Sequence, residues 1–219
     1  VDIPKNVTAE TADYEPQPLK REEPTLLTAE AEQAIVELAE MIRSHDKVFL
    51  LAGGGVLKSN ASGELLALAN RLKAPVGTTL MGVGAFPSTH ESFMGLVGMH
   101  GTRAANTAIS QSELFVALGS RFNDRVTGDT AKFGKNAKIV QVDIDPAEIN
   151  KNVRTAHHVL GDVKQVLMRL LALLSEEQLD TKEREQWLGS LQALKLPARA
   201  ARNEGFSPKA VLGAVYTQS

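Results

Sequence analysis

The chain has 219 residues, of which 43% are hydrophobic and 23% are charged, so it can bury one sizeable core like an ordinary globular protein. Its net charge of −2 offers no positive field for nucleic acid, and the absence of cysteine excludes disulfides, thiolate catalysis and cysteine metal sites. No apolar run approaches the roughly 20 residues that span a bilayer, and no signal peptide is visible. We therefore expect a cytoplasmic protein that binds neither nucleic acid nor membrane.

The first 27 residues combine a possible strand end with a segment of linker composition. Residues 1–4 look like the tail of a strand whose partners are missing. Residues 5–27 are polar, with three prolines that stiffen the segment and a charged run at 20–23 that keeps it solvated. We expect residues 1–27 to form the end of one domain and a linker.

Residues 28–175 alternate between helical and strand patterns. The predicted strands are residues 47–52, 75–79, 114–118, 138–143 and 158–160. One predicted helix begins after the cap residue Thr28, and the others span residues 61–73, 102–110, 146–151 and 162–174. This alternation predicts an α/β fold, a doubly wound, Rossmann-like parallel sheet of about six strands with helices on both faces.

Residues 176–219 are expected to be a second linker and the start of another domain. The first part, to residue 205, is charged and predicted to be helical around Trp187. A further helix is expected to begin with Ser207 as its N-cap and Pro208 as its first residue, just before the chain stops. From both ends we expect this sequence to be a piece of a longer polypeptide. The alternative is a mature protein produced by processing.

Residues 119–128 place Arg121 and Arg125 directly after an apolar run that is typical of a buried strand. In open α/β sheets, ligands bind at the carboxyl ends of the strands. Two guanidinium groups four residues apart suit a ligand with phosphates or a delocalised anion. For this segment taken alone, a solvated loop with two salt bridges is the alternative.

Four other predicted strands also end in loops of ligand-binding character. A glycine triplet at 53–55 would let the backbone approach a pyrophosphate, although a tight turn explains it equally well. Residues 79–82 follow the second strand, and further glycines stand at 84, 95, 98 and 101; between the last two lie a methionine and a histidine, and the histidine could be structural instead. Asp143 could accept ribose hydroxyls or cap the next helix, and residues 161–163 offer backbone N–H groups at a helix start.

An extended, nucleotide-like ligand explains these five loops together, because such a ligand needs several strand ends at once. In the usual NAD fingerprint the acidic residue follows the second strand, which here ends in Thr78 and Thr79. That departure argues against an ordinary dehydrogenase. No Gly-x-Ser-x-Gly, His-Glu-x-x-His or Walker motif is present, and with no cysteine and only five histidines a zinc site is not expected.

The same loops resemble the large, catalytic subunit of acetohydroxyacid synthase, also called acetolactate synthase, a thiamine-diphosphate-dependent family. The most specific matches are Met-His-Gly at 99–101 and the Arg-Phe-x-Asp-Arg pattern at 121–125. The family has three domains, and the resemblance implies that residues 28–175 are the central one. Residues 1–27 would then end the pyrimidine-binding domain, and residues 176–219 would begin the pyrophosphate-binding domain.

The resemblance also implies that the central domain binds FAD, which the family requires although its net reaction is not a redox reaction. The positions that match the family's FAD contacts are Gly53, Gly54, Gly55, Thr79, Leu80, Gly98, Met99, His100, Gly119, Arg121, Arg125, Val126, Asp143, Ile144, Asp162 and Val163. Met99, Asp124 and Arg125 also match positions near the substrate channel. Asn123 stands where the family usually has Asp, which would weaken the hold on an arginine if that position held one by charge.

By the same resemblance, the parent enzyme decarboxylates pyruvate and joins the two-carbon unit to pyruvate or 2-oxobutanoate in branched-chain amino-acid biosynthesis. Its thiamine diphosphate and Mg²⁺ sites would lie outside this chain, since the family's Gly-Asp-Gly motif is absent here. We expect the chain alone to be inactive and to bind FAD weakly. The expected partners are the flanking thiamine-diphosphate domains, further copies in a homodimer or homotetramer, and a regulatory subunit.

Two alternatives remain open at this point. The chain could be the central domain of another thiamine-diphosphate-dependent decarboxylase or oxidase, holding an ADP-like nucleotide. It could also be a structural spacer without a ligand.

Overall fold

The computed structural model describes residues 4–11, 13, 15, 27–130, 132–175 and 179–195. The strand tail expected at the start of the chain lies largely outside these residues, as does the helix expected after Ser207. Much of both expected linkers is outside them as well.

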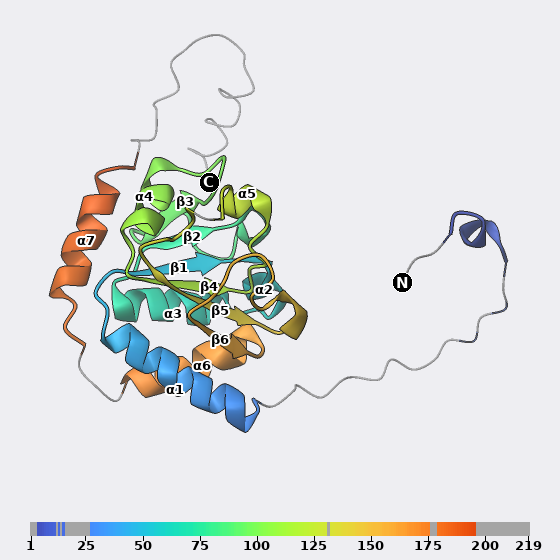
Figure 1. Ribbon diagram of the computed structural model, residues 1–219, viewed down its shortest axis with the longest axis horizontal. Helices are drawn as coiled ribbons and strands as arrows, with labels where there is room; N and C mark the ends of the chain where they lie inside the picture. Colours follow the sequence, from blue (N-terminus) through green and yellow to red (C-terminus); the bar gives the residue numbers. More distant parts are fainter. Residues whose placement is uncertain are drawn as a thin grey trace, which may run out of the picture.

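Within the described residues, a six-stranded, all-parallel sheet forms the centre of the fold, in the order β3-β2-β1-β4-β5-β6 (Figure 1). The strands are β1 (Val48–Ala52), β2 (Val76–Thr78), β3 (Phe93–Leu96), β4 (Leu114–Leu118), β5 (Lys138–Asp143) and β6 (His157–Leu160). The chain builds outward from β1 to β3, returns to place β4 on the other side of β1, and continues outward to β6. The predicted doubly wound α/β sheet is confirmed, and its order reverses between β1 and β4, where a crevice opens at the carboxyl ends.

Helices cover both faces of this sheet (Figure 1). One face carries α1 (Ala29–Arg43), α3 (Ser62–Leu72) and α6 (Val163–Ser175), and the other carries α4 (Arg103–Gln111) and α7 (Lys182–Gln192). The short elements are α2 (Gly54–Lys58), α5 (Asp124–Thr127) and the 3-10 turns η1 (Val7–Ala9), η2 (Leu80–Gly82) and η3 (Pro146–Glu148).

The central strands are apolar throughout because both faces are covered. In β1, Val48, Leu50 and Ala52 pack toward α1, α3 and α6, while Phe49 and Leu51 pack toward α4 and α7. All five residues are 0–1% exposed. A strand buried on both sides needs hydrophobic side chains at odd and even positions alike, which explains the continuous apolar run in the sequence.

The helices begin and bury residues as their sequence patterns predict. The Thr28 side chain accepts a hydrogen bond from the backbone N–H of Ala31 and caps α1, and Thr102 caps α4 in the same way through Ala105. In α1, Ile35 and Ile42 lie two turns apart on the same face of the helix, and both are fully buried. Residues 182–192 around Trp187 are helical as predicted.

The short helices α2 and α5 were not predicted, and two further elements differ from the sequence prediction. The edge strand β3 has no regular strand pattern, because Gly95 takes φ +97° and the pairing with β2 shifts register beside it. The helix expected at 146–151 is a single 3-10 turn, because the backbone becomes extended at Ile149 and then turns left-handed at Asn150, at φ +59°. The Asn150 side chain then accepts hydrogen bonds from the backbone N–H and hydroxyl of Thr155.

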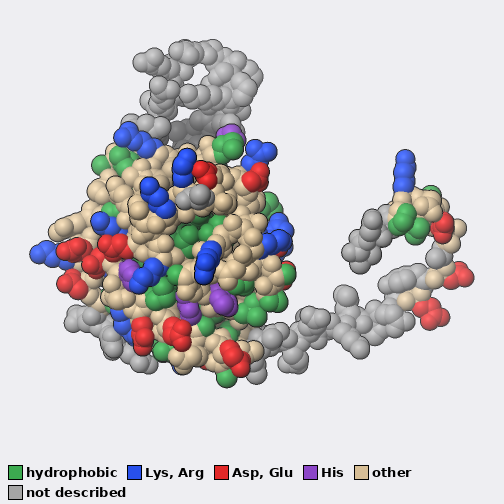
Figure 2. Space-filling view, in the orientation of Figure 1, with side chains coloured by type: hydrophobic (Ala, Val, Ile, Leu, Met, Phe, Trp, Pro, Cys, Tyr) green, Lys and Arg blue, Asp and Glu red, His purple; other side chains and the backbone are tan. Residues whose placement is uncertain are grey.

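On the face shown in Figure 2, basic side chains are scattered among acidic ones rather than gathered into one positive area. Across the described residues, the helices are all too short or too polar to cross a membrane.

Candidate functional site

A cavity of about 980 Å³ lies at the carboxyl ends of the strands, where the sheet order reverses. Its wall is built from the loops after β1, β2, β4, β5 and β6 together with residues at the end of β3. All five loops that the sequence singled out therefore meet at one cavity.

Gly55 and Gly119 form the floor of the cavity between β1 and β4, and Gly53 joins the same two loops. The backbone N–H of Gly53 donates to Leu118 O at 2.9 Å, and that of Gly55 donates to Gly119 O at 3.1 Å. A Cβ atom on Gly53 would overlap the carbonyl oxygen of Gly119, and Gly119 itself has φ +59°. The two loops can approach this closely only because neither position carries a side chain.

The arginine loop is held by an aromatic anchor. Phe122 is 2% exposed, and its ring centroid lies 6.1 Å from Phe115 and 5.9 Å from Phe133. Its φ of +51° is uncommon for a bulky residue. With Phe122 buried, the neighbouring Arg121 and the following Arg125 both line the cavity.

Asn123 caps the short helix α5. Its Oδ1 accepts a hydrogen bond from the backbone N–H of Val126 at 3.1 Å. Asn and Asp are about equally good N-caps, so the departure at this position keeps the local structure of the loop. The arginine-holding role that the sequence suggested for this position is not seen; its oxygen is used for the cap.

The Met-His-Gly loop supports the arginine loop. The backbone N–H of Met99 donates to Arg125 O at 3.0 Å, and the Asn106 side chain bonds both the N–H and the carbonyl of Gly98 at 3.0 Å. His100 lines the cavity, whereas the Met99 side chain is 62% exposed. Backbone contacts therefore join two loops that lie far apart in the sequence.

The loop after β5 carries a buried carboxylate. Asp143 is 7% exposed, and its Oδ1 accepts from the N–H of Asp145 at 3.1 Å. Burial raises the pKa of Asp143, and the charges of Glu148 and Asp145 raise it further, while backbone hydrogen bonds from Asp145 and Ile144 oppose the change. The residue that caps η3 is Asp145, whose Oδ1 accepts from the N–H of Ala147. The capping role considered for Asp143 therefore belongs to Asp145.

In the loop after β6, an aspartate side chain caps the start of α6. The Asp162 side chain accepts from the backbone N–H groups of Lys164 and Gln165, at 3.0 and 3.2 Å. These two N–H groups at the start of α6 are therefore already bonded within the protein. Asp162 and Val163 nevertheless line the cavity.

The cavity does not include every residue that the sequence proposed. Four of them, Gly53, Gly98, Met99 and Asp124, are not part of its lining. The lining also contains residues outside the proposed set: Lys58, Ser59, Met81, Leu96, Val97, Ser120, Phe122, Asn123, Asp145 and Glu148. Lys58 lies four residues after Gly54, and residues four apart share one face of a helix. A helix predicted to start at the glycine triplet would therefore have pointed to Lys58.

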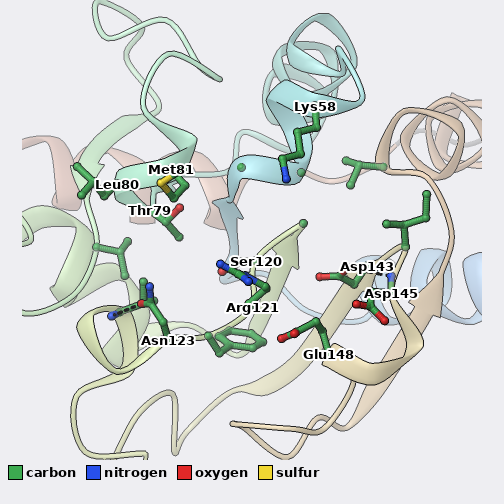
Figure 3. A pocket seen from close by; sticks show the side chains of 18 of the residues that line it. Lys58, Thr79, Leu80, Met81, Ser120, Arg121, Asn123, Asp143, Asp145 and Glu148 are labelled. Atoms are coloured by element: carbon green, nitrogen blue, oxygen red, sulfur yellow. Dashed lines mark hydrogen bonds between the residues drawn. The ribbon is translucent and has the colours of Figure 1, made fainter. Parts of the chain in front are cut away.

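The lining has three parts (Figure 3). The apolar end contains Leu80 and Met81, 76% and 69% exposed, together with Leu96, Val97 and Val126. The cationic middle has Lys58 and Arg121, and the acidic end has Asp143, Asp145 and Glu148. In the part of the chain that the structure describes, no three His, Asp or Glu side chains are grouped so as to hold a metal ion.

Three curated proteins similar to this chain are named as large subunits of acetolactate synthase. A "Probable acetolactate synthase large subunit" of Methanocaldococcus jannaschii is 46% identical over 199 residues, covering 89% of this chain and 33% of that protein. The acetolactate synthase large subunit of Corynebacterium glutamicum is 42% identical, covering 89% and 31%. That of Haemophilus influenzae is 41% identical, covering 78% and 30%. The chain thus spans about a third of the length of these relatives.

A family model described as "Thiamine pyrophosphate enzyme, central domain" matches residues 35–170. That range contains all six strands of the sheet described above and every loop that forms the cavity. The chain belongs to the family of thiamine pyrophosphate enzyme central domains.

Proposed function

We propose that this chain is the FAD-binding central domain of an acetolactate synthase large subunit. The observation that carries the proposal is the three-part cavity, whose apolar end, cationic middle and acidic end correspond in order to a flavin ring, a diphosphate and an adenosine. Its volume of about 980 Å³ is large enough for an extended ligand of this kind.

The apolar end favours FAD over a smaller nucleotide. Leu80 and Met81 expose most of their side chains in this structure, and leaving such apolar surface in water is unfavourable. A flavin ring lying on them would cover this surface. ADP would occupy only the cationic middle and the acidic end, and would leave the apolar end in contact with water.

The remaining parts of the cavity suit the rest of FAD. Arg121 and Lys58 offer charge-assisted hydrogen bonds to phosphate oxygens, and the glycine floor lets the diphosphate approach the backbone. Asp143 is placed to accept hydrogen bonds from ribose hydroxyls. When bound, FAD would supply a redox-capable ring at the apolar end.

Ligand titration of the 219-residue chain tests this assignment. Calorimetry with FAD, ADP and NAD should show FAD binding most tightly. Tighter binding of ADP or NAD would favour a central domain that holds another nucleotide. No binding of any of the three would favour a spacer.

The activity of the parent protein is a separate part of the proposal. With its flanking sequence restored, the protein should form acetolactate from pyruvate when thiamine diphosphate, Mg²⁺ and FAD are supplied. We propose that it works in the cytoplasm as a homodimer or homotetramer, with a regulatory subunit as a further candidate partner. A full-length protein that retains no FAD and makes no acetolactate would contradict the assignment.

Three residues of the arginine and methionine loops are proposed to serve the substrate channel of that parent. Met99 is 62% exposed, and the side chains of Asp124 and Arg125 are 84% and 69% exposed. Arg125 lines the cavity, and Met99 and Asp124 belong to the same two loops, where a flanking domain could cover them.

A further inference from the structure

Lys58 is a cation in the cavity to which the described residues offer no ion-pair partner. It is the last residue of α2, and its side chain reaches into the cavity toward Ser120 and Arg121 (Figure 3). Among the described residues, no carboxylate forms an ion pair or hydrogen bond with Lys58 or with the Arg121 guanidinium, although four carboxylates line the same cavity. One of these, Glu148, pairs with Lys151 at 2.8 Å instead.

The backbone that carries Lys58 is fixed on two sides. The N–H of Gly55, one turn earlier, donates to Gly119 O at 3.1 Å. The hydroxyl of Ser59, the next residue, accepts from the N–H of Lys164 at the start of α6, at 3.2 Å. The lysine stem is flexible, but its point of attachment is held between the β4 loop and α6.

Arg121 is anchored separately. Its carbonyl accepts from the Asn152 side chain at 2.9 Å, and the neighbouring Phe122 is buried. The two cations therefore come from different elements, α2 and the loop after β4, and Lys58 lies above Arg121 in the view of Figure 3. Two unpaired cations placed in this way favour an anion between them.

We propose that Lys58 binds the diphosphate of the dinucleotide from the side opposite Arg121 and makes this site selective for phosphate-bearing ligands over unphosphorylated flavin. This inference rests on the proposed function and deepens it. A lysine suits the role because its ammonium group is a mobile point charge with three donors, which can follow a diphosphate without a fixed geometry. Because the contact is ionic, it also weakens as salt rises.

The test compares three ligands on the full 219-residue chain: FAD, ADP and riboflavin, each titrated at low and high salt. Lys58→Met should weaken FAD and ADP binding about tenfold, the scale of one charge-assisted hydrogen bond, and leave riboflavin binding unchanged. The same variant should show a smaller loss of FAD affinity with salt than the wild type. Lys58→Arg, which keeps the charge, should retain most of the affinity.

Lys182→Met is the matched control, because it removes the same charge from an exposed lysine on α7 that does not line the cavity. It should bind all three ligands as the wild type does. Unchanged FAD affinity in Lys58→Met, or an equal loss of riboflavin affinity, would overturn the inference while leaving the proposed function intact. A wild-type chain that binds neither FAD nor ADP would instead contradict the proposed function and the inference together.

Discussion

A substitution at Gly53 tests the close approach of the β1 and β4 loops at the base of the cavity. Gly53→Ala should lower the free energy of unfolding by about 1–3 kcal/mol, because the added methyl group overlaps the Gly119 carbonyl and forces β1 and β4 loops apart. Urea denaturation followed by circular dichroism measures the change. FAD affinity should fall as well, since the diphosphate would meet a displaced backbone.

Gly63→Ala is the control for this substitution. Gly63 lies in α3, and a Cβ atom there would have no heavy atom within 4 Å. Alanine should raise the free energy of unfolding by roughly 0.5–1 kcal/mol, because it restricts the unfolded chain and favours the helix. If both variants shifted stability in the same direction and by the same amount, the close approach at Gly53 would not be the cause.

The buried carboxylate of Asp143 is expected to lower the free energy of unfolding at neutral pH. Its raised pKa means that the folded state holds the proton more tightly than the unfolded chain. The stability associated with this proton is present below pH 3.8, the ordinary value, and is lost as the pH rises through the raised pKa. Asp143→Asn should therefore be at least as stable as the wild type at pH 7, and its advantage should shrink toward pH 4.

The same variant should lose affinity for FAD and ADP by about tenfold, because a neutral amide accepts hydrogen bonds from ribose hydroxyls less strongly than a carboxylate. Calorimetric titration at pH 7 measures this loss. Asp180→Asn is the control, since Asp180 is exposed, lies outside the cavity and likewise accepts a hydrogen bond from a backbone N–H two residues on. Weaker binding in Asp180→Asn would show that the amide substitution acts through net charge rather than through the site.

At the scale of elements, α7 is joined to the domain by a buried arginine. Arg184 is 2% exposed, and its Nη2 donates to the carbonyls of Ile42 and His45, at 2.6 and 2.8 Å, where α1 ends. Burial lowers the pKa of Arg184, and the charge of Asp46 opposes that change. On the same helix, Trp187 donates from Nε1 to the Gln111 side chain of α4 at 3.0 Å.

Arg184→Ala should detach α7 before the sheet unfolds. Two hydrogen bonds from a charged group are lost, and we expect α7 to be weakened by about 2–3 kcal/mol. Trp187 is the single tryptophan of the chain, so its fluorescence reports this helix directly. Its emission should shift to the red at a lower urea concentration than the loss of circular dichroism.

Lys182→Ala serves as the control on the same helix, because Lys182 is exposed and the change should leave the two transitions together. Coincident transitions in Arg184→Ala would mean that α7 and the sheet unfold as one unit regardless of this contact.

At the scale of the whole molecule, the cavity touches five strand-end loops, so its ligand should stabilise the entire sheet. A ligand that binds only the folded state adds about 2.7 kcal/mol when present at 100 times its Kd. FAD at that concentration should raise the melting temperature of the chain, and Gly53→Ala should show a smaller increase at the same FAD concentration. A wild-type melting temperature that does not change with FAD would contradict binding at this cavity.

Local sequence patterns were sufficient for the elements that bury regular faces. The apolar runs at β1, β4 and β5 and the helical spacing in α1 and α3 predict those elements because burial imposes the same period on any such strand or helix. The edge strand β3 was missed because Gly95 breaks the pattern and only pairing with β2 makes the segment a strand.

The sequence by itself determined the class of fold and the loops that meet at the carboxyl edge, since parallel strands must end on the same side. Only the tertiary structure decided which side chains reach the cavity. Lys58 enters through the direction of α2, the Asp162 carboxylate is turned to its own helix, and Met99 faces outward while its backbone supports Arg125. The direction of a side chain depends on the packing of segments far apart in the chain, and local sequence does not encode that packing.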